Sequence, residues 1–185
     1  MNSRSRITHC LAVTLIATLC STYRAVPASA DKALELGPAA VGKPLTMKFQ
    51  ALDGSEVDVS KLQGKVVMID FWATWCGPCR AELPNVKAAY EKLHPKGFEI
   101  IGVSFDKSKK DLQTFITKEK MPWPQYFDGL AWKNKIARLY HVNAIPQTVL
   151  VDQDGAVRAV GLRGSKLAAE IDHLLKKLDK HEKSQ

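Results

Sequence analysis

Residues 66–79, which read VVMIDFWATWCGPC, are the stretch that decides how this chain folds. Their first half, residues 66–72, is a near-continuous apolar run of strand length, which is typical of a strand covered on both faces. Their second half carries two cysteines separated by a glycine and a proline, and apolar residues at helical spacing follow. The stretch therefore predicts a buried strand that gives way to a helix at the cysteine pair.

Strand patterns occur on both sides of this stretch. Residues 98–105, 148–151 and 156–160 predict further strands, and Asp154-Gly155 joins the last two in a hairpin. Upstream, residues 43–59 contain two short extended pieces around Asp53-Gly54, which predict a second hairpin. No repeat and no linker divides residues 43–180.

Helical spacing of apolar residues predicts four helices between and after these strands. The second helix begins at Ser108 and Asp111, which have the spacing of a capping box. Strands and helices that alternate and end in an antiparallel hairpin predict an α/β fold, with a mixed central sheet, helices on both faces and an N-terminal β-hairpin extension. The inner faces are marked, helix by helix, by Leu83, Val86, Tyr90 and Leu93, by Leu112, Phe115 and Ile116, by Trp132, Ile136 and Leu139, and by Leu167, Ile171, Leu174 and Leu178.

Length and composition fit one folded domain. The 185 residues suit a single domain, and a hydrophobic content of 45% excludes a disordered chain. Four cysteines are too few for a small disulfide-stapled secreted protein. We expect a leader at residues 31–43, a domain at 44–180 and a charged tail at 181–185.

Residues 1–30 have the three parts of a secretory signal peptide. Arg4 and Arg6 form a basic start, residues 7–20 are apolar, and Ala28-Ser29-Ala30 forms a small-residue cleavage site. The apolar part is short for a membrane-spanning helix, and an uncleaved N-terminal anchor is the alternative. We therefore expect an extracytoplasmic, periplasmic protein.

Removal of residues 1–30 changes the charge and the cysteine content. Three arginines are lost and no acidic residue, so the net charge falls from +8 to +5. Because the remaining lysines are scattered apart from the C-terminal tail, we expect no nucleic-acid partner. Cys10 and Cys20 are also lost, and Cys76 and Cys79 are the only thiols of the mature chain.

The spacing of Cys76 and Cys79 places both sulfur atoms on one face of a helix start, close enough to form a disulfide. Unpaired N–H groups and the positive end of the helix dipole favour the thiolate of Cys76, which makes it the more nucleophilic partner. Pro78 fits the first helical turn, which does not need its N–H. A structural disulfide is a competing interpretation, but a loop this short restrains the unfolded chain little. Zinc would need two more ligands, and no other cysteine pair or histidine spacing supplies them.

Two carboxylates can serve the cysteines as proton acceptors. Glu82 lies one helical turn after Cys79, and Asp70 lies late on the buried strand. A carboxylate near a thiol can accept its proton. Glu82 can also be an ordinary acidic residue near a helix start, whereas a charge within an apolar strand is costly without a role.

The stretch DFWATWCGPC at residues 70–79 resembles the thioredoxin active site. The wider pattern resembles the TlpA/ResA branch of extracytoplasmic thiol-disulfide oxidoreductases, in the signal peptide, the N-terminal hairpin, WCGPCRAELP at 75–84 and AIPQT at 144–148. This resemblance covers residues 40–178. It implies a thioredoxin fold with a cis peptide bond before Pro146, opposite the cysteines, which leaves the main chain of Ile145 open to a substrate strand.

The resemblance also implies roles for individual residues. Trp75, Gly77 and Pro78 would contact the substrate together with Ile145 and Pro146. Asp70 matches the buried proton acceptor of thioredoxins and Glu82 matches that of the TlpA/ResA branch, so the two stay alternatives.

We therefore expect an extracytoplasmic oxidoreductase that acts on protein disulfides without a cofactor or metal, as a monomer. The Gly-Pro pair between the cysteines favours a reductant that a membrane thiol donor recharges, and the thiols of apocytochromes are one substrate that the resemblance suggests.

Two other functions compete. A peroxiredoxin-type thiol peroxidase would need a Thr-x-x-Cys arrangement, but Ala73 stands at the threonine position and Thr74 is one residue late. A copper-binding assembly protein would use Cys76, Cys79 and a histidine, and no histidine is obviously placed for this.

Overall fold

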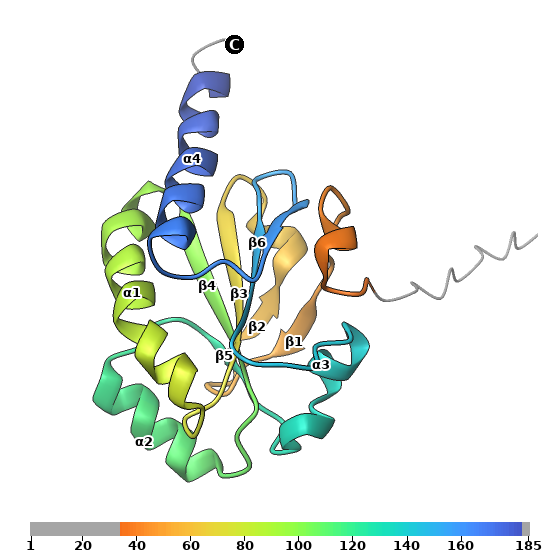
Figure 1. Cartoon of the computed structure of the whole chain (residues 1–185), viewed down its shortest axis with the longest axis vertical. Coiled ribbons are helices and arrows are strands. Elements are labelled where there is room, and N and C mark those ends of the chain that lie inside the picture. Colours follow the sequence, from red (N-terminus) through yellow and green to blue (C-terminus); the bar gives the residue numbers. More distant parts are fainter. Residues whose placement is uncertain (1–33, 183–185) are drawn as a thin grey trace, which may run out of the picture. The chain divides into compact units, whose positions relative to one another are not determined.

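The computed structural model describes residues 34–182, and the side chains of residues up to Lys177. A five-stranded mixed sheet forms the centre in the order β5-β4-β3-β6-β7, which confirms the predicted fold class (Figure 1). The strands are β1 Lys48–Gln50, β2 Glu56–Asp58, β3 Val66–Trp72, β4 Phe98–Ser104, β5 Gln125–Tyr126, β6 Gln147–Val151 and β7 Val157–Val160. The helices are α1 Gly77–Leu93, α2 Lys109–Glu119, α3 Lys135–Leu139 and α4 Gly164–Glu182, with short 3-10 helices η1 Pro38–Ala40, η2 Val59–Leu62, η3 His94–Lys96 and η4 Ala131–Lys133.

Strand β3 lies at the middle of the sheet and is buried along its whole length. It pairs in parallel with β4 and antiparallel with β6, so both of its edges are covered. Helices α1, α2 and α4 lie on one side of the sheet in Figure 1, and α3 lies on the other side with the β1–β2 hairpin. Because both faces are covered, a run of apolar residues is what this strand requires.

The predicted hairpins and the first, second and fourth helices are confirmed. β1 pairs antiparallel with β2, and β6 pairs antiparallel with β7. The side chain of Ser108 accepts a hydrogen bond from the N–H of Asp111 at 3.2 Å and so caps α2 as its spacing predicts. The inner-face residues Leu167, Ile171 and Leu174 of α4 are buried, and the side chain of Leu178 lies outside the described residues.

The predicted third helix is wrong in its extent and its inner face. The segment forms two pieces, η4 and α3, because the side chain of Asn134 caps a new helix by accepting a hydrogen bond from the N–H of Ala137 at 3.0 Å. Of the three residues expected inside, only Ile136 is buried. Trp132 and Leu139 are 51% and 52% exposed.

The described part of the expected leader packs onto the domain. Leu36 and Ala40 are buried, and the N–H of Leu36 donates to the carbonyl of Tyr140 at 3.0 Å. The N–H of Gly42 donates to the carbonyl of Val157 at 2.8 Å. The expected signal peptide, residues 1–30, and the last residues of the expected tail, 183–185, lie outside the described residues. None of the helices within residues 34–182 has both the length and the apolar character needed to span a membrane.

Candidate active site

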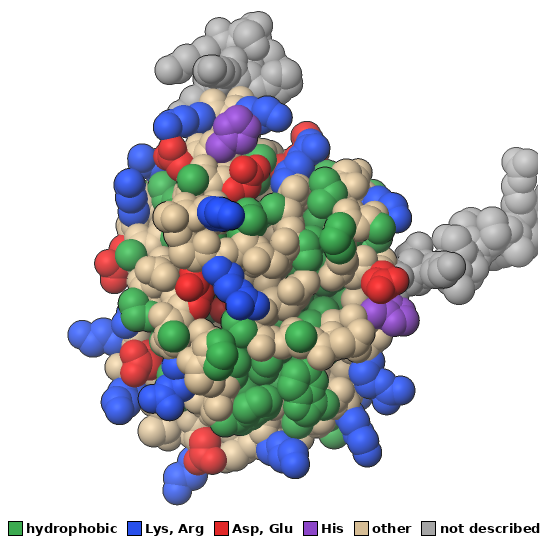
Figure 2. All heavy atoms as spheres, in the orientation of Figure 1, with side chains coloured by type: hydrophobic (Ala, Val, Ile, Leu, Met, Phe, Trp, Pro, Cys, Tyr) green, Lys and Arg blue, Asp and Glu red, His purple; other side chains and the backbone are tan. Residues whose placement is uncertain are grey.

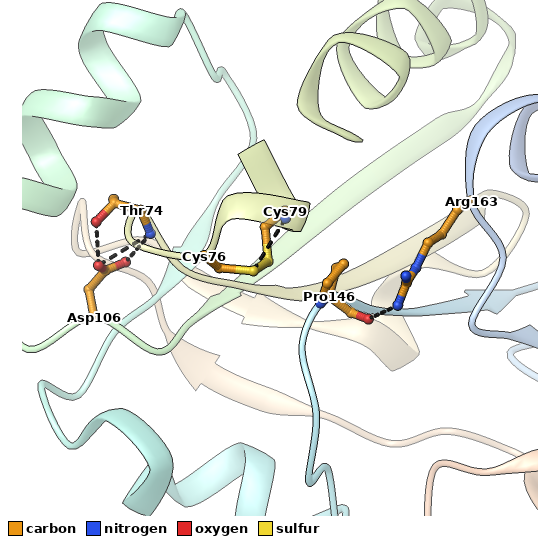
Figure 3. Close-up of a disulfide and its surroundings, with 6 residues drawn as sticks. All are labelled: Thr74, Cys76, Cys79, Asp106, Pro146 and Arg163. Carbon is orange, nitrogen blue, oxygen red and sulfur yellow. Dashed lines mark hydrogen bonds between the residues drawn. A yellow bond between two sulfur atoms is a disulfide. The ribbon is translucent and has the colours of Figure 1, made fainter. Parts of the chain in front are cut away.

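Cys76 and Cys79 form a disulfide at the point where β3 leads into α1 (Figure 3). Their Cα atoms are 5.3 Å apart, within the ordinary range for a bridged pair. Both cysteines are buried, with 5% and 7% of their surface exposed, so exposure does not distinguish their reactivity. The predicted proximity of the two sulfur atoms is confirmed, and their redox roles stay predictions.

Because Cys76 lies at the start of α1, its sulfur atom has different electrostatic surroundings from the sulfur atom of Cys79. Cys76 is the N-cap residue, and its Sγ accepts a hydrogen bond from the N–H of Cys79 at 3.2 Å. Pro78 has no N–H and lies in the first turn, where none is needed. After reduction, the same N–H and the helix dipole would stabilise a thiolate on Cys76, in agreement with its predicted role as nucleophile.

The loop between β3 and Cys76 is held by Asp106, which the sequence patterns do not single out. Its carboxylate accepts hydrogen bonds from the N–H of Thr74 at 3.1 Å and from the Thr74 hydroxyl at 2.6 Å. The hydroxyl of Ser104 donates to the same carboxylate at 2.8 Å. Because β3 and β4 are parallel, their carboxyl ends meet at one edge of the sheet, and an acidic residue just after β4 could have been noted on that ground.

The loop before β6 approaches the disulfide from the other side. Figure 3 shows Pro146 beside the cysteines and Thr74–Asp106 on their opposite side. The Ile145–Pro146 peptide bond is cis, as the resemblance implies. Ile145 is half-buried, and within residues 34–182 its main chain makes no hydrogen bond, which leaves it available to a substrate strand.

Arg163 binds this loop and is a further residue that sequence reasoning missed. Its Nη2 donates to the carbonyl of Pro146 at 2.7 Å (Figure 3). The residue lies between β7 and α4, and its partner is 17 residues away. No local pattern marks such a contact, because it depends on how the β6–β7 hairpin folds back.

Replacement of Arg163 by methionine is expected to weaken substrate binding while the disulfide still forms. The variant keeps the aliphatic stem but loses a charge-assisted hydrogen bond to the Pro146 carbonyl, so KM for a peptide disulfide should rise about fivefold to tenfold with little change in kcat. Steady-state kinetics measure this, with Arg138→Met on the exposed face of α3 as the matched control. Equal KM values for the two variants would contradict a positioning role.

The two candidate proton acceptors occupy different environments. Asp70 is 8% exposed, and its side chain has no hydrogen-bond partner within residues 34–182. Burial, helped by the negative charge of Glu82, raises the pKa of Asp70 to about 7. Glu82 instead accepts hydrogen bonds from the N–H of Gly164 at the start of α4 and from Nδ2 of Asn85. Asp70 therefore has a free carboxyl group that titrates near neutral pH.

Within residues 34–182, no group of three or more histidine, cysteine, aspartate or glutamate side chains is arranged to hold a metal ion.

Comparisons with a family model and with known proteins identify relatives of this chain. The model of the AhpC/TSA family matches residues 41–160. The chain is 32% identical over 130 residues to the thiol-disulfide oxidoreductase ResA of Oceanobacillus iheyensis, covering 70% of this chain and 66% of that protein. It is 29% identical over 150 residues to ResA of Bacillus cereus, covering 81% of this chain and 82% of the relative.

Two solved structures share this fold. One is the thioredoxin domain of a thiol-disulfide oxidoreductase from Bacteroides vulgatus, with a TM-score of 0.66, 30% identity and coverage of 74% of this chain and 98% of that domain. The other is a thiol:disulfide interchange protein from Bacteroides sp., with a TM-score of 0.64, 30% identity and coverage of 74% and 91%.

Proposed function

Because the chain belongs to the AhpC/TSA family, as a TlpA/ResA-like member of the thioredoxin superfamily, we propose that it is an extracytoplasmic reductant of protein disulfides. Its relatives are named thiol-disulfide oxidoreductases, and the chain is a thioredoxin-like redox enzyme of this kind. The observation that carries the proposal is the Cys76–Cys79 disulfide at the N-terminus of α1, where one sulfur atom accepts a main-chain N–H.

The reaction begins with the dithiol form. The thiolate of Cys76 attacks one sulfur of the substrate disulfide, whose S–S bond breaks and releases the first substrate thiolate, which takes up a proton. Cys79 then loses its proton and attacks Sγ of Cys76, which releases the second substrate thiol and closes the Cys76–Cys79 bond. Two electrons pass from the dithiol to the substrate, and a membrane thiol donor would return them.

Asp70 is the better supported acceptor for the proton of Cys79. A base whose pKa lies near the working pH serves proton transfer best, and the pKa of Asp70 is raised to about 7. Glu82 is already engaged by Gly164 and Asn85, so it acts in this proposal through its charge on Asp70 and by joining α1 to α4.

The location and the substrates rest on the sequence. The signal-peptide pattern of residues 1–30 supports an extracytoplasmic site, and the resemblance to the TlpA/ResA branch suggests apocytochrome thiols among the targets. Trp75, Gly77 and Pro78, which adjoin the disulfide, and Ile145 and Pro146 opposite it would form the substrate-contacting surface.

The direction of electron flow is tested with the chemically reduced protein. One equivalent of the reduced protein, freed of reductant, is expected to reduce one disulfide of native insulin. Titration of the thiols formed on insulin measures this. The reduction potential of the Cys76–Cys79 couple is expected to be about −270 mV, the range of reducing thioredoxins, and a value of about −120 mV would make the protein an oxidant instead.

The peroxidase alternative is tested by peroxide consumption in the same preparation. Ala73 is buried at the position where that chemistry needs a threonine, and the hydroxyl of Thr74 is bound to Asp106. We expect hydrogen peroxide to oxidise the dithiol far more slowly than a protein disulfide does.

A further inference from the structure

We propose that Trp132 and Trp75 form a groove beside Cys76 that selects disulfide substrates carrying a large apolar side chain near the attacked cysteine. This inference rests on the proposed function and adds a substrate class to it. The groove has a volume of about 510 Å³ and is called the tryptophan groove below. The lining residues that carry the argument are Thr74, Trp75, Asp106, Asp111, Ala131 and Trp132.

Both tryptophans present apolar surface to solvent. Trp75 is 53% exposed and Trp132 is 51% exposed, and their ring centroids are 6.2 Å apart at an interplanar angle of 56°. On the face shown in Figure 2, hydrophobic side chains gather below the centre, between α1 and the segment of η4 and α3. Two large exposed aromatic rings beside a reactive group are a site where a partner can gain binding energy by covering them.

Trp132 is held in place by the protein core. Its ring packs edge-on against Phe105, with centroids 5.0 Å apart, and Phe105 is fully buried. The indole is therefore anchored on the core while about half of the residue stays exposed, so ordering its ring on binding would cost little entropy.

Three hydrogen bonds hold the backbone around Trp132 in place. The carboxylate of Asp128 accepts hydrogen bonds from the N–H of Leu130 at 2.9 Å and from the N–H of Lys135 at 2.8 Å. Nδ2 of Asn134 donates to the carbonyl of Ser104 at 2.9 Å. Ala131 has a φ of 50°, a left-handed conformation that is unfavourable for a residue other than glycine. These contacts maintain a turn that local preference disfavours, and the turn directs Trp132 outward.

The groove and the Pro146 loop lie on opposite sides of the disulfide. Figure 3 shows Thr74 and Asp106, which belong to the groove, on one side of Cys76–Cys79 and Pro146 on the other. A substrate strand that pairs with Ile145 and brings its cysteine to Cys76 would continue across Trp75 into the groove. An extended chain advances about 3.3 Å per residue, so a residue one or two positions from the attacked cysteine reaches the tryptophans.

The chemistry of the walls indicates an apolar occupant. The Asp106 carboxylate is already bound by Thr74 and Ser104. Asp106 is only 3% exposed, and the remaining charged residues of the groove, Lys107 and Asp111, have opposite signs, so the exposed walls favour neither sign of ligand charge. The aromatic walls therefore carry the selection, and phenylalanine or leucine side chains fit them better than serine.

The test uses short peptides with one cysteine joined to thionitrobenzoate through a mixed disulfide. The parent peptide has serine at the two positions on each side of the cysteine, and four others place one phenylalanine at each position in turn. For the reduced protein, the rate constant for at least one phenylalanine peptide should exceed that of the parent about tenfold, on one side of the cysteine only.

Trp132→Ala and Trp132→Gln should reduce this ratio to within about twofold, because either change removes the aromatic wall. Leu139→Ala, which removes an equally exposed apolar side chain outside the groove, should keep the full preference. The groove would be ruled out as the selecting site if a folded Trp132 variant still reacted about tenfold faster with the phenylalanine peptide than with the parent peptide. Equal rate constants of the wild-type protein for all five peptides would also rule it out. Neither result would contradict the redox function. Failure of the reduced wild-type protein to react with any peptide would instead overturn the proposed function.

Discussion

Replacement of Cys79 by alanine is expected to turn the protein into a covalent trap for its substrates. Cys76 can still attack a disulfide, but no second thiol is present to release the mixed disulfide, so the adduct accumulates. The measurement is non-reducing electrophoresis and mass spectrometry after the reduced variant meets oxidised insulin. All chains should carry Cys10→Ser and Cys20→Ser, so that only the pair in question can react.

The matched variant is Cys76→Ala, in which Cys79 is left alone inside the first turn of α1. This variant should form no adduct, and its disulfide reductase activity should fall at least about 1,000-fold, because the activated nucleophile is gone. Trapping by Cys76→Ala and release by Cys79→Ala would reverse the assignment of the two sulfur atoms. Retention of reductase activity in Cys76→Ala would rule out the proposed mixed-disulfide mechanism.

Asp70→Asn is expected to change the pH dependence of stability strongly. The unfolded pKa of an aspartate is near 3.8, and burial raises the folded pKa of Asp70 to about 7. The folded state therefore holds the proton more tightly, and the free energy of unfolding falls as pH rises from about 4 to about 7. The loss amounts to roughly 4 kcal/mol, from about three pKa units at 1.36 kcal/mol each.

The asparagine variant should escape this loss because it carries no titrating proton. Urea unfolding of the oxidised wild-type protein and the variant at pH 4 and pH 8 measures the effect. The free energy of unfolding of the variant minus that of the wild type should be larger at pH 8 than at pH 4, by up to roughly 4 kcal/mol. The same difference at both pH values would mean that Asp70 keeps an ordinary carboxyl pKa.

The same variant tests whether Asp70 or Glu82 accepts the proton of Cys79. If Asp70 accepts the proton of Cys79, Asp70→Asn should slow release of the mixed disulfide about 10-fold to 100-fold near pH 7, as loss of a general base does. Glu82→Gln should slow the same step less, through its weaker effect on Asp70. The reverse order of the two variants, measured by stopped-flow release of the substrate thiol, would assign the role to Glu82.

Local patterns predicted most of the fold. The apolar run of β3, the turn residues of the two hairpins and the helical spacing in α1 and α4 each need only neighbouring residues to be interpreted. The third helix shows where this fails. Trp132, Ile136 and Leu139 have helical spacing, but Asn134 restarts the helix and leaves Trp132 on a separate turn. The leader shows the same limit, since nothing local indicates that Leu36 would be buried against Tyr140.

The sequence by itself determined the cysteine pair, its position at a helix start, the strand before it and the two acids near it, because spacing along the chain sets all of these. The tertiary structure decided what surrounds the pair. The Asp106–Thr74, Arg163–Pro146 and Glu82–Gly164 contacts join residues 32, 17 and 82 positions apart. The order of strands in the sheet and the path of the loops bring such partners together, and burial of Asp70 between β4 and β6 raises its pKa. No spacing within the chain encodes these distances, and the chemistry of the pair depends on them.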